Sequence, residues 1–225
     1  MRLSLILTSW LALAATAAAQ NPEDTRRFYP LDHQQPVGRA GRWQATIYPG
    51  LSSYSQPVRI ALPSEGEVTF YQGSPQAGVV TPAPAQAGMQ VGYVYRVKIA
   101  QMADYPGVEL YPTIELLDRL HPPTELKDKF PIPIELTTAE IETALNDQMV
   151  TKVIYLEQPQ LATPTRQIDG KMHTEVLEHD INLLEAADRR GRPIAIVRLG
   201  GRIPDPQSPQ DEFFSTSPLT FIPQP

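Results

Sequence analysis

The sequence predicts a mainly β protein with a sandwich-like antiparallel sheet and two short helices in its C-terminal half; an α+β fold is the alternative. Two observations support this prediction. Proline supplies 24 of the 225 residues, about twice the average share of roughly 5%, and proline at this density breaks long helices. Several short segments also alternate apolar and polar residues with a period of two, which is typical of half-buried strands.

Residues 1–19 have the pattern of a secretory signal peptide. Arg2 gives a positive start, a mostly apolar run follows, and Ala17 to Ala19 supply the small residues that precede a cleavage site. We therefore predict cleavage before Gln20. An uncleaved membrane anchor is the alternative, but the run is shorter than the about 20 apolar residues that span a bilayer. The signal predicts an exported protein, periplasmic or extracellular, that does not insert into the membrane after cleavage.

The sequence contains no cysteine. Disulfides therefore cannot hold the mature chain together, and its stability has to come from a packed core. Cysteine-based zinc sites, thiol catalysis and lipid attachment at an N-terminal cysteine are excluded as well. The sequence also lacks an Asn-x-Ser/Thr glycosylation sequon. Together with the signal peptide, these features favour a bacterial protein.

The mature chain is expected to begin with a flexible lead-in over residues 20–41, which are polar and contain three prolines. A β-rich domain over residues 42–200 follows. Three alternating runs open this domain, at residues 43–47, 58–62 and 68–70. Each run places its apolar residues on one face, so we predict three short strands.

Residues 73–88 contain three glycines, three prolines and four alanines. A segment of this composition has little apolar surface to bury, so we expect it to be extended or loop-like. Two interpretations stay open. The segment is either a boundary between two domains or a long surface loop inside one.

The clearest alternation predicts an antiparallel hairpin formed by residues 90–100 and 108–116. Tyr93 and Tyr95 share a face with the valines of the first strand, so we expect both tyrosine rings to point into the core. Pro112 lies inside the second strand. Because proline cannot donate a hydrogen bond to a neighbouring strand, this strand should be at an edge or carry a bulge.

The next segment alternates proline with apolar residues over 130–134 and is expected to lie extended over the core. Thr137 and Glu140 have the spacing of a capping box, which predicts a short helix ending near Gln148. Residues 150–157 follow as a strand. This strand is apolar on both faces, so we expect a central, covered position in the sheet.

A second helix is predicted to begin at Asp180 and to end at Gly191, with Arg189 and Arg190 placed favourably at its C-terminus. Residues 172–176 alternate and could form one more strand before it. The apolar run over 193–199 predicts a buried strand after it. The last segment, residues 201–225, is a proline-rich tail. We expect its aromatic residues to dock onto the body of the protein; they are Phe213, Phe214 and Phe221.

Charge and motifs exclude several classes of function. The formal net charge is −6, so no basic field is present to attract nucleic acid. The sequence lacks a Gly-x-Ser-x-Gly turn, a P-loop, a dinucleotide-binding fingerprint and a His-Glu-x-x-His motif. We therefore assign no catalytic residue, no cofactor-binding residue and no cofactor, and a non-catalytic protein is favoured over an enzyme.

One group of side chains has the chemistry of a metal site: Met172, His173, Glu175, His179 and Asp180. Imidazole and carboxylate groups can bind a divalent cation together. A strand face followed by a helix start explains the same residues without a metal. We prefer this second interpretation and predict no metal ligands.

Aromatic side chains that could stack on a sugar ring are Tyr48, Tyr54 and Tyr71. They make a carbohydrate-binding module one alternative function, and a hydrolase is a weaker one. The favoured prediction is a binding or structural module that contacts another protein or a component of the cell envelope. Extended proline-rich arms support this prediction because they lose little conformational entropy when they dock on a partner.

Overall fold

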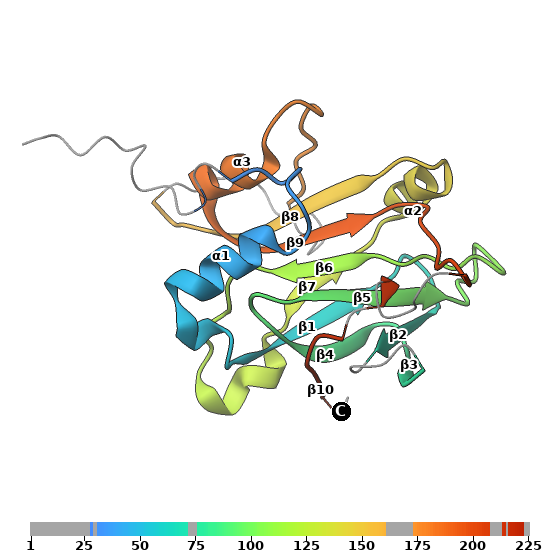
Figure 1. The fold of residues 1–225 in the computed structure, drawn as a ribbon, viewed down its shortest axis with the longest axis horizontal. Coiled ribbons are helices and arrows are strands. Elements are labelled where there is room, and N and C mark those ends of the chain that lie inside the picture. Colours follow the sequence, from blue (N-terminus) through green and yellow to red (C-terminus); the bar gives the residue numbers. More distant parts are fainter. Residues whose placement is uncertain are drawn as a thin grey trace, which may run out of the picture.

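A computed structural model gives the fold of this protein (Figure 1). It describes Phe28 and residues 31–71, 76–160, 173–207, 213–214 and 216–222. The predicted signal peptide, its cleavage site before Gln20, and Met172 lie outside the described residues.

Two β-sheets pack face to face, which confirms the predicted β-sandwich-like fold. The four-stranded sheet has the order β10 (Leu219–Phe221), β4 (Ala85–Gln90), β1 (Ser55–Ala61) and β7 (Ile132–Glu135). The six-stranded sheet has the order β3 (Gly78–Pro82), β2 (Glu67–Tyr71), β5 (Val94–Ala100), β6 (Thr113–Leu116), β9 (Gly191–Leu199) and β8 (Val150–Glu157). Neighbouring strands are antiparallel except β1 and β7, which are parallel.

The main core lies between the two sheets because the inward positions of both are apolar. Val58 and Ile60 of β1 face Phe70 of β2 and Ile114 of β6 across this core, and all four side chains are almost completely buried. Burial of an aliphatic or aromatic side chain of this size contributes about 1.5–3 kcal/mol relative to exposure. The apolar residues whose alternation predicts β1 and β2 are therefore the ones that point into the core.

Helix α2 (Thr138–Leu145) closes one end of the sandwich (Figure 1). The predicted capping box is confirmed. The Thr137 hydroxyl accepts a hydrogen bond from the Glu140 amide at 3.3 Å, and the Glu140 carboxylate accepts one from the Thr137 amide at 2.8 Å. Ile141 on the buried side of this helix packs against Ile99 of β5 and Leu199 of β9.

Helix α3 (Leu183–Arg190) confirms the second predicted helix, with corrected ends. Its N-cap is Asn182, whose side-chain oxygen accepts hydrogen bonds from two backbone amides, and the prediction of Asp180 was wrong. Gly191 has an extended backbone with φ −179° and begins β9 directly, so the predicted left-handed cap was wrong too. The helix passes into the strand without an intervening turn.

The strand predicted at residues 43–47 is instead part of helix α1 (Arg39–Ile47). The buried face of this helix is formed by Ala40, Gly41 and Gln44, at helical spacing, whereas Trp43 and Ile47 are exposed. Trp43 and Ile47 alternate with polar residues in the sequence, but they do not form the buried face of this segment. The small size of Ala40 and Gly41 lets the helix approach the sheet closely.

Within residues 73–88, where we expected an extended or loop-like segment, the structure has strand β3 and most of strand β4. Ala85 and Ala87 are completely buried in the main core, although alanine offers little apolar area. Gly88 faces the other side of β4, where a side chain would meet Ser55 and Thr220. Small residues are thus required by close packing in β4, and their low apolar content concealed the strand.

The predicted hairpin is confirmed by the antiparallel pairing of β5 with β6. Tyr95 is buried as expected, but Tyr93 is 40% exposed because a turn at Gly92, with φ 93°, interrupts the predicted strand. Pro112 precedes β6, and its carbonyl accepts a hydrogen bond from the Val97 amide at 3.2 Å. β6 lies between β5 and β9 and pairs with β5 without a register shift, so the prediction of an edge position or a bulge was wrong.

Strand β8 has the predicted bounds, but it is an edge strand and not a central one. Both of its faces are nevertheless partly covered, because the half-buried Ile154 packs against the main core and the half-buried Val153 packs on the opposite side of the sheet near α3. Apolar residues on both faces of a strand therefore report covered faces, and they do not distinguish a central strand from a covered edge.

The region of the predicted strand at 172–176 is described from His173 onward and has no regular structure there. Val176 is 93% exposed. The alternating pattern of this segment does not correspond to a buried face. The predicted strand was therefore wrong.

The C-terminal aromatic residues dock as predicted. Phe213 and Phe214 pack against Tyr71 and Tyr111 on the outer face of the six-stranded sheet, with 4.4 Å between the ring centroids of Tyr71 and Phe214. Burial, with a smaller effect of the Glu109 charge, raises the pKa of Tyr71 to about 12. Phe221 lies in β10 and packs against the main core.

Candidate functional site

Helix α1 and the segment before it form a surface of the described chain that exposes several large side chains. Part of the expected lead-in, residues 31–38, lies against the six-stranded sheet and α3. The side-chain amide of Asn182 donates a hydrogen bond to the Leu31 carbonyl at 2.9 Å. Leu31 and His33 are both buried. Leu31 shares an apolar cluster with Leu184 of α3 and Ile196 of β9.

A buried ion pair fixes α1 on the sheet. Arg198 of β9 lies 3.0 Å from the carboxylate of Glu115 in β6, and Glu115 is 1% exposed. The same carboxylate accepts a hydrogen bond from the Gly41 amide at 2.8 Å, and Arg198 donates another to the His33 carbonyl at 2.9 Å. One charge pair thus holds both α1 and the segment that precedes it.

Gly41 also has a steric role in this attachment. A Cβ atom at this position would lie 2.7 Å from the carbonyl oxygen of Leu116, closer than any real Cβ approaches a backbone atom. The helix could accommodate a side chain here only by moving away from β6. The position of α1 therefore depends on glycine at residue 41.

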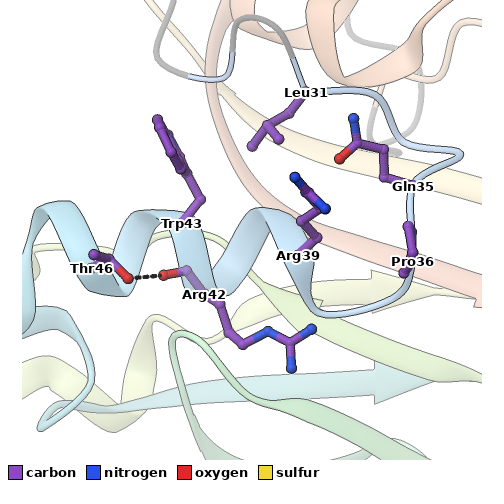
Figure 2. A pocket seen from close by; sticks show the side chains of 7 residues that line it. All are labelled: Leu31, Gln35, Pro36, Arg39, Arg42, Trp43 and Thr46. Carbon is purple, nitrogen blue, oxygen red and sulfur yellow. Dashed lines mark hydrogen bonds between the residues drawn. The ribbon is translucent and has the colours of Figure 1, made fainter.

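The outer side of α1 borders a shallow groove of about 490 Å³. Figure 2 shows Arg39 and Trp43 projecting from the helix toward Leu31, which lies on the opposite side of the groove, while Arg42 projects in another direction. The lining residues are Leu31, Gln35, Pro36, Arg39, Arg42, Trp43 and Thr46.

The exposed side of α1 combines aromatic, aliphatic and cationic side chains. Trp43, Ile47 and Tyr48 are 44%, 46% and 50% exposed. Trp43 and Ile47 are four residues apart and therefore share one face of the helix. In the part of the chain that the structure describes, neither Arg39 nor Arg42 forms an ion pair.

The chemistry of this surface suits binding. Its polar groups are two guanidinium ions, an amide, an indole N–H and a hydroxyl. Arginine stays charged at all physiological pH values, and the lining contains no imidazole or carboxylate that could act as an acid or base near neutral pH. The surface can therefore attract an anionic partner and provide aromatic contact area.

This surface is not among the sites predicted from the sequence, although residues 39–47 carry a signal for it. Trp43 and Ile47 fit the exposed face of a helix, and Ala40, Gly41 and Gln44 fit the buried face at helical spacing. We assigned these residues to a strand because a five-residue window is too short to separate the two periods.

The structure separates the potential metal ligands that it describes. His173, Glu175, His179 and Asp180 are all exposed, and Glu175 forms an ion pair with Arg190 at 2.7 Å. Within the described ranges, no group of three or more potential metal ligands comes together.

The three tyrosines considered for sugar stacking have different surroundings. Tyr71 is covered by Phe214, and the ring of Tyr54 lies under Arg119 and Lys127. Tyr48 is half exposed and adjoins the α1 surface in the sequence. Of these three rings, Tyr48 is therefore the one that offers an open face.

Comparisons with protein-family models, with curated proteins and with solved structures found no match to this chain. In the described part of the chain, none of the helices has the length and apolar character needed to cross a membrane.

Proposed function

We propose that this is a non-catalytic, exported protein that binds another envelope or secreted protein through the outer side of α1. The observation that carries this proposal is the exposure of Trp43 and Tyr48 beside Arg39 and Arg42. Tryptophan, tyrosine and arginine are the residue types that most often dominate binding energy at protein interfaces.

The charge of this surface indicates the kind of partner. The chain as a whole is acidic, with a formal net charge of −6, but α1 carries two arginines and no acidic residue. Such a local reversal of charge steers an oppositely charged partner to one region of the surface. The partner segment is therefore acidic, with at least one apolar side chain to cover Trp43.

The attachment of α1 to the sheet supports binding at low entropic cost. The Gly41 amide and the Glu115 carboxylate hold the helix in place before any partner arrives. A surface that is already ordered loses less conformational freedom on association than a mobile one. The exposed side chains therefore need only small adjustments to bind.

Export is a separate part of the proposal and rests on residues 1–19. When the full chain is expressed in a bacterium, we expect the mature protein in the periplasm or the medium, with Gln20 as its first residue. N-terminal sequencing of the purified protein measures this directly. An intact Met1 on protein that stays in the cytoplasm would refute export without affecting the binding proposal.

The binding proposal predicts position-dependent cross-linking. A photoreactive amino acid at Ile47 of the mature chain should capture a discrete envelope protein, whereas the same group at Val80, an exposed residue of β3, should not. Trp43→Ala and the double substitution Arg39→Glu with Arg42→Glu should each weaken binding of the captured partner at least about 30-fold, as expected for hot-spot residues.

Matched controls keep this test specific. Arg59→Glu changes an exposed arginine on β1 of the four-stranded sheet, whereas α1 is attached to β6 of the other sheet, and it should leave the affinity within about twofold. Equal losses from Arg59→Glu and Arg39→Glu would contradict a surface-specific interaction. Binding to a glycan that is lost in Trp43→Ala would instead assign the same surface to carbohydrate.

A further inference from the structure

A buried histidine connects the segment before α1 to the start of helix α3. Nδ1 of the His33 ring accepts a hydrogen bond from the Leu183 amide, the first amide of the helix, at 3.1 Å. The Asn182 side chain caps the next two amides and donates a hydrogen bond to the Leu31 carbonyl. The His33 ring thus completes the cap of α3 from a position 150 residues away in the sequence.

A second polar group lies at hydrogen-bond distance from the same ring nitrogen. Oδ1 of Asp32 is 2.9 Å from Nδ1 of His33. A ring nitrogen of histidine either accepts a hydrogen bond through its lone pair or carries a proton and donates one. Nδ1 can therefore bind the Leu183 amide only without a proton, and it can donate to Asp32 only with one. Its protonation decides which of the two groups is its partner.

The unprotonated nitrogen serves both groups better in the folded protein. Oδ1 of Asp32 also accepts a hydrogen bond from the Gln34 amide at 2.9 Å, so it has a donor without the histidine. For the Leu183 amide, the described part of the chain shows His33 as the acceptor. A proton on Nδ1 would turn this bond into a contact between two N–H groups, and the amide at the helix start would lose its partner.

The carboxylate of Asp32 does not reverse the direction of this effect. Asp32 directly precedes His33 in the chain, so it stays close to the ring whether or not the segment lies on α3. The bond to the Leu183 amide exists only in the docked segment. Because docking alone depends on an unprotonated Nδ1, proton binding favours the undocked segment.

The charged groups on the other elements around His33 are paired or favour a neutral ring. Arg198 of β9 donates a hydrogen bond to the His33 carbonyl at 2.9 Å, and its charge is balanced by Glu115 of β6. The N-terminus of α3 has a partial positive charge, which disfavours a cationic ring. Glu185 in the first turn of α3 forms an ion pair with Arg189 at 2.6 Å. The other ionisable residues at the nearby ends of these elements are exposed; they are Arg39, Glu178, His179 and Asp180.

We propose that His33 is a pH-dependent latch. Residues 31–38 stay docked on the start of α3 while Nδ1 is unprotonated, and protonation of the ring between about pH 8 and 5, where histidine changes its charge, releases them. This segment contributes Leu31, Gln35 and Pro36 to the groove that Trp43 borders from α1 (Figure 2). Release therefore opens one wall of the groove. The effect of acid on partner binding rests on the proposed function, whereas the latch itself does not.

An NMR titration of the purified protein from pH 8 to 5 tests the latch. The signals of the Leu183 amide and the Trp43 indole N–H should shift with a common midpoint, since both report the same release. Protection of the Leu183 amide against hydrogen exchange, corrected for the pH dependence of an unstructured chain, should fall about fivefold when its hydrogen bond is lost. A Leu183 signal and protection that stay constant over this range would overturn the proposal.

Two substitutions assign the transition to the ring of His33. His33→Asn supplies an amide oxygen that accepts a hydrogen bond at every pH, so protection of the Leu183 amide should persist to pH 5. Asp32→Asn removes the carboxylate but keeps the ring, so the transition should remain. Circular dichroism verifies that each variant is folded. A transition that persists in His33→Asn, or that disappears in Asp32→Asn, would contradict the latch.

His179 provides a matched control, because it is an exposed histidine four residues before Leu183. His179→Gln should leave the transition unchanged, and its loss in this variant would assign the titration to His179 instead. Binding of a partner captured through Ile47 should weaken about fivefold at pH 5 in the wild type but not in His33→Asn. Equal affinity at pH 8 and 5 would contradict the opening of the groove. Failure to capture any partner would count against binding at α1 alone, since Leu183 and Trp43 report the latch without a partner.

Discussion

Arg198→Ala is expected to destabilise the folded protein by about 3–5 kcal/mol, because it leaves a buried carboxylate without its charge partner. Glu115 is 1% exposed and accepts hydrogen bonds from both Arg198 and the Gly41 amide. Loss of Arg198 also removes the hydrogen bond to the His33 carbonyl. The free energy of unfolding, measured by urea denaturation with circular dichroism, gives the size of the effect.

An exposed ion pair serves as the control for this prediction. Arg189 and Glu185 lie 2.6 Å apart on the surface of α3, and Arg189→Ala should cost less than about 1 kcal/mol because water screens the pair. The double substitution Glu115→Gln with Arg198→Met should recover most of the loss, since it removes both buried charges. Equal effects of Arg198→Ala and Arg189→Ala would show that the Glu115 pair does not anchor α1.

Phe70→Ala is expected to cost about 3–5 kcal/mol, the range measured for truncation of a buried phenylalanine. Phe70 is completely buried between the two sheets, where its ring contacts strands of both. Truncation removes apolar area and leaves a cavity that the close-packed sheets cannot fill. Thermal and urea unfolding should both report the loss.

The neighbouring strand offers a matched control. Val80 of β3 is 54% exposed, and Val80→Ala should change the free energy of unfolding by less than about 0.5–1 kcal/mol. If Phe70→Ala were no more costly than Val80→Ala, the two sheets would not share the core described above.

The strands with large apolar residues could be predicted from the sequence because alternation reports side chains that leave water. Strand β2 follows this pattern with buried Val68 and Phe70, whereas β9 could be predicted from its continuous run of buried aliphatic residues. Strand β4 could not be predicted in this way. Two of its three core positions are Ala85 and Ala87, which offer little apolar area, and only the third, Met89, is large.

The order of the strands in each sheet could not be predicted from the sequence, for a different reason. Periodicity reports which face of a strand is buried, but it does not identify the neighbouring strand. β8 illustrates this limit, because Val153 and Ile154 are covered on opposite faces while the strand remains at an edge.

The α1 surface depends on contacts between distant segments. Glu115 and Arg198 are 83 residues apart, and Gly41 and Glu115 are 74 residues apart. No local spacing could reveal these groups. Trp43 is the exception, since a helical interpretation of residues 39–47 would have placed it on an exposed face beside two arginines.

The C-terminal arm has a consequence for the order of events during biosynthesis. Strand β10 completes the four-stranded sheet, Phe213 and Phe214 cover the outside of the other sheet, and the buried Tyr95 hydroxyl donates a hydrogen bond to the Pro218 carbonyl at 2.7 Å. Both layers thus require residues that are translated after the strands that they complete. A nascent chain therefore cannot complete its core before this arm has been translated.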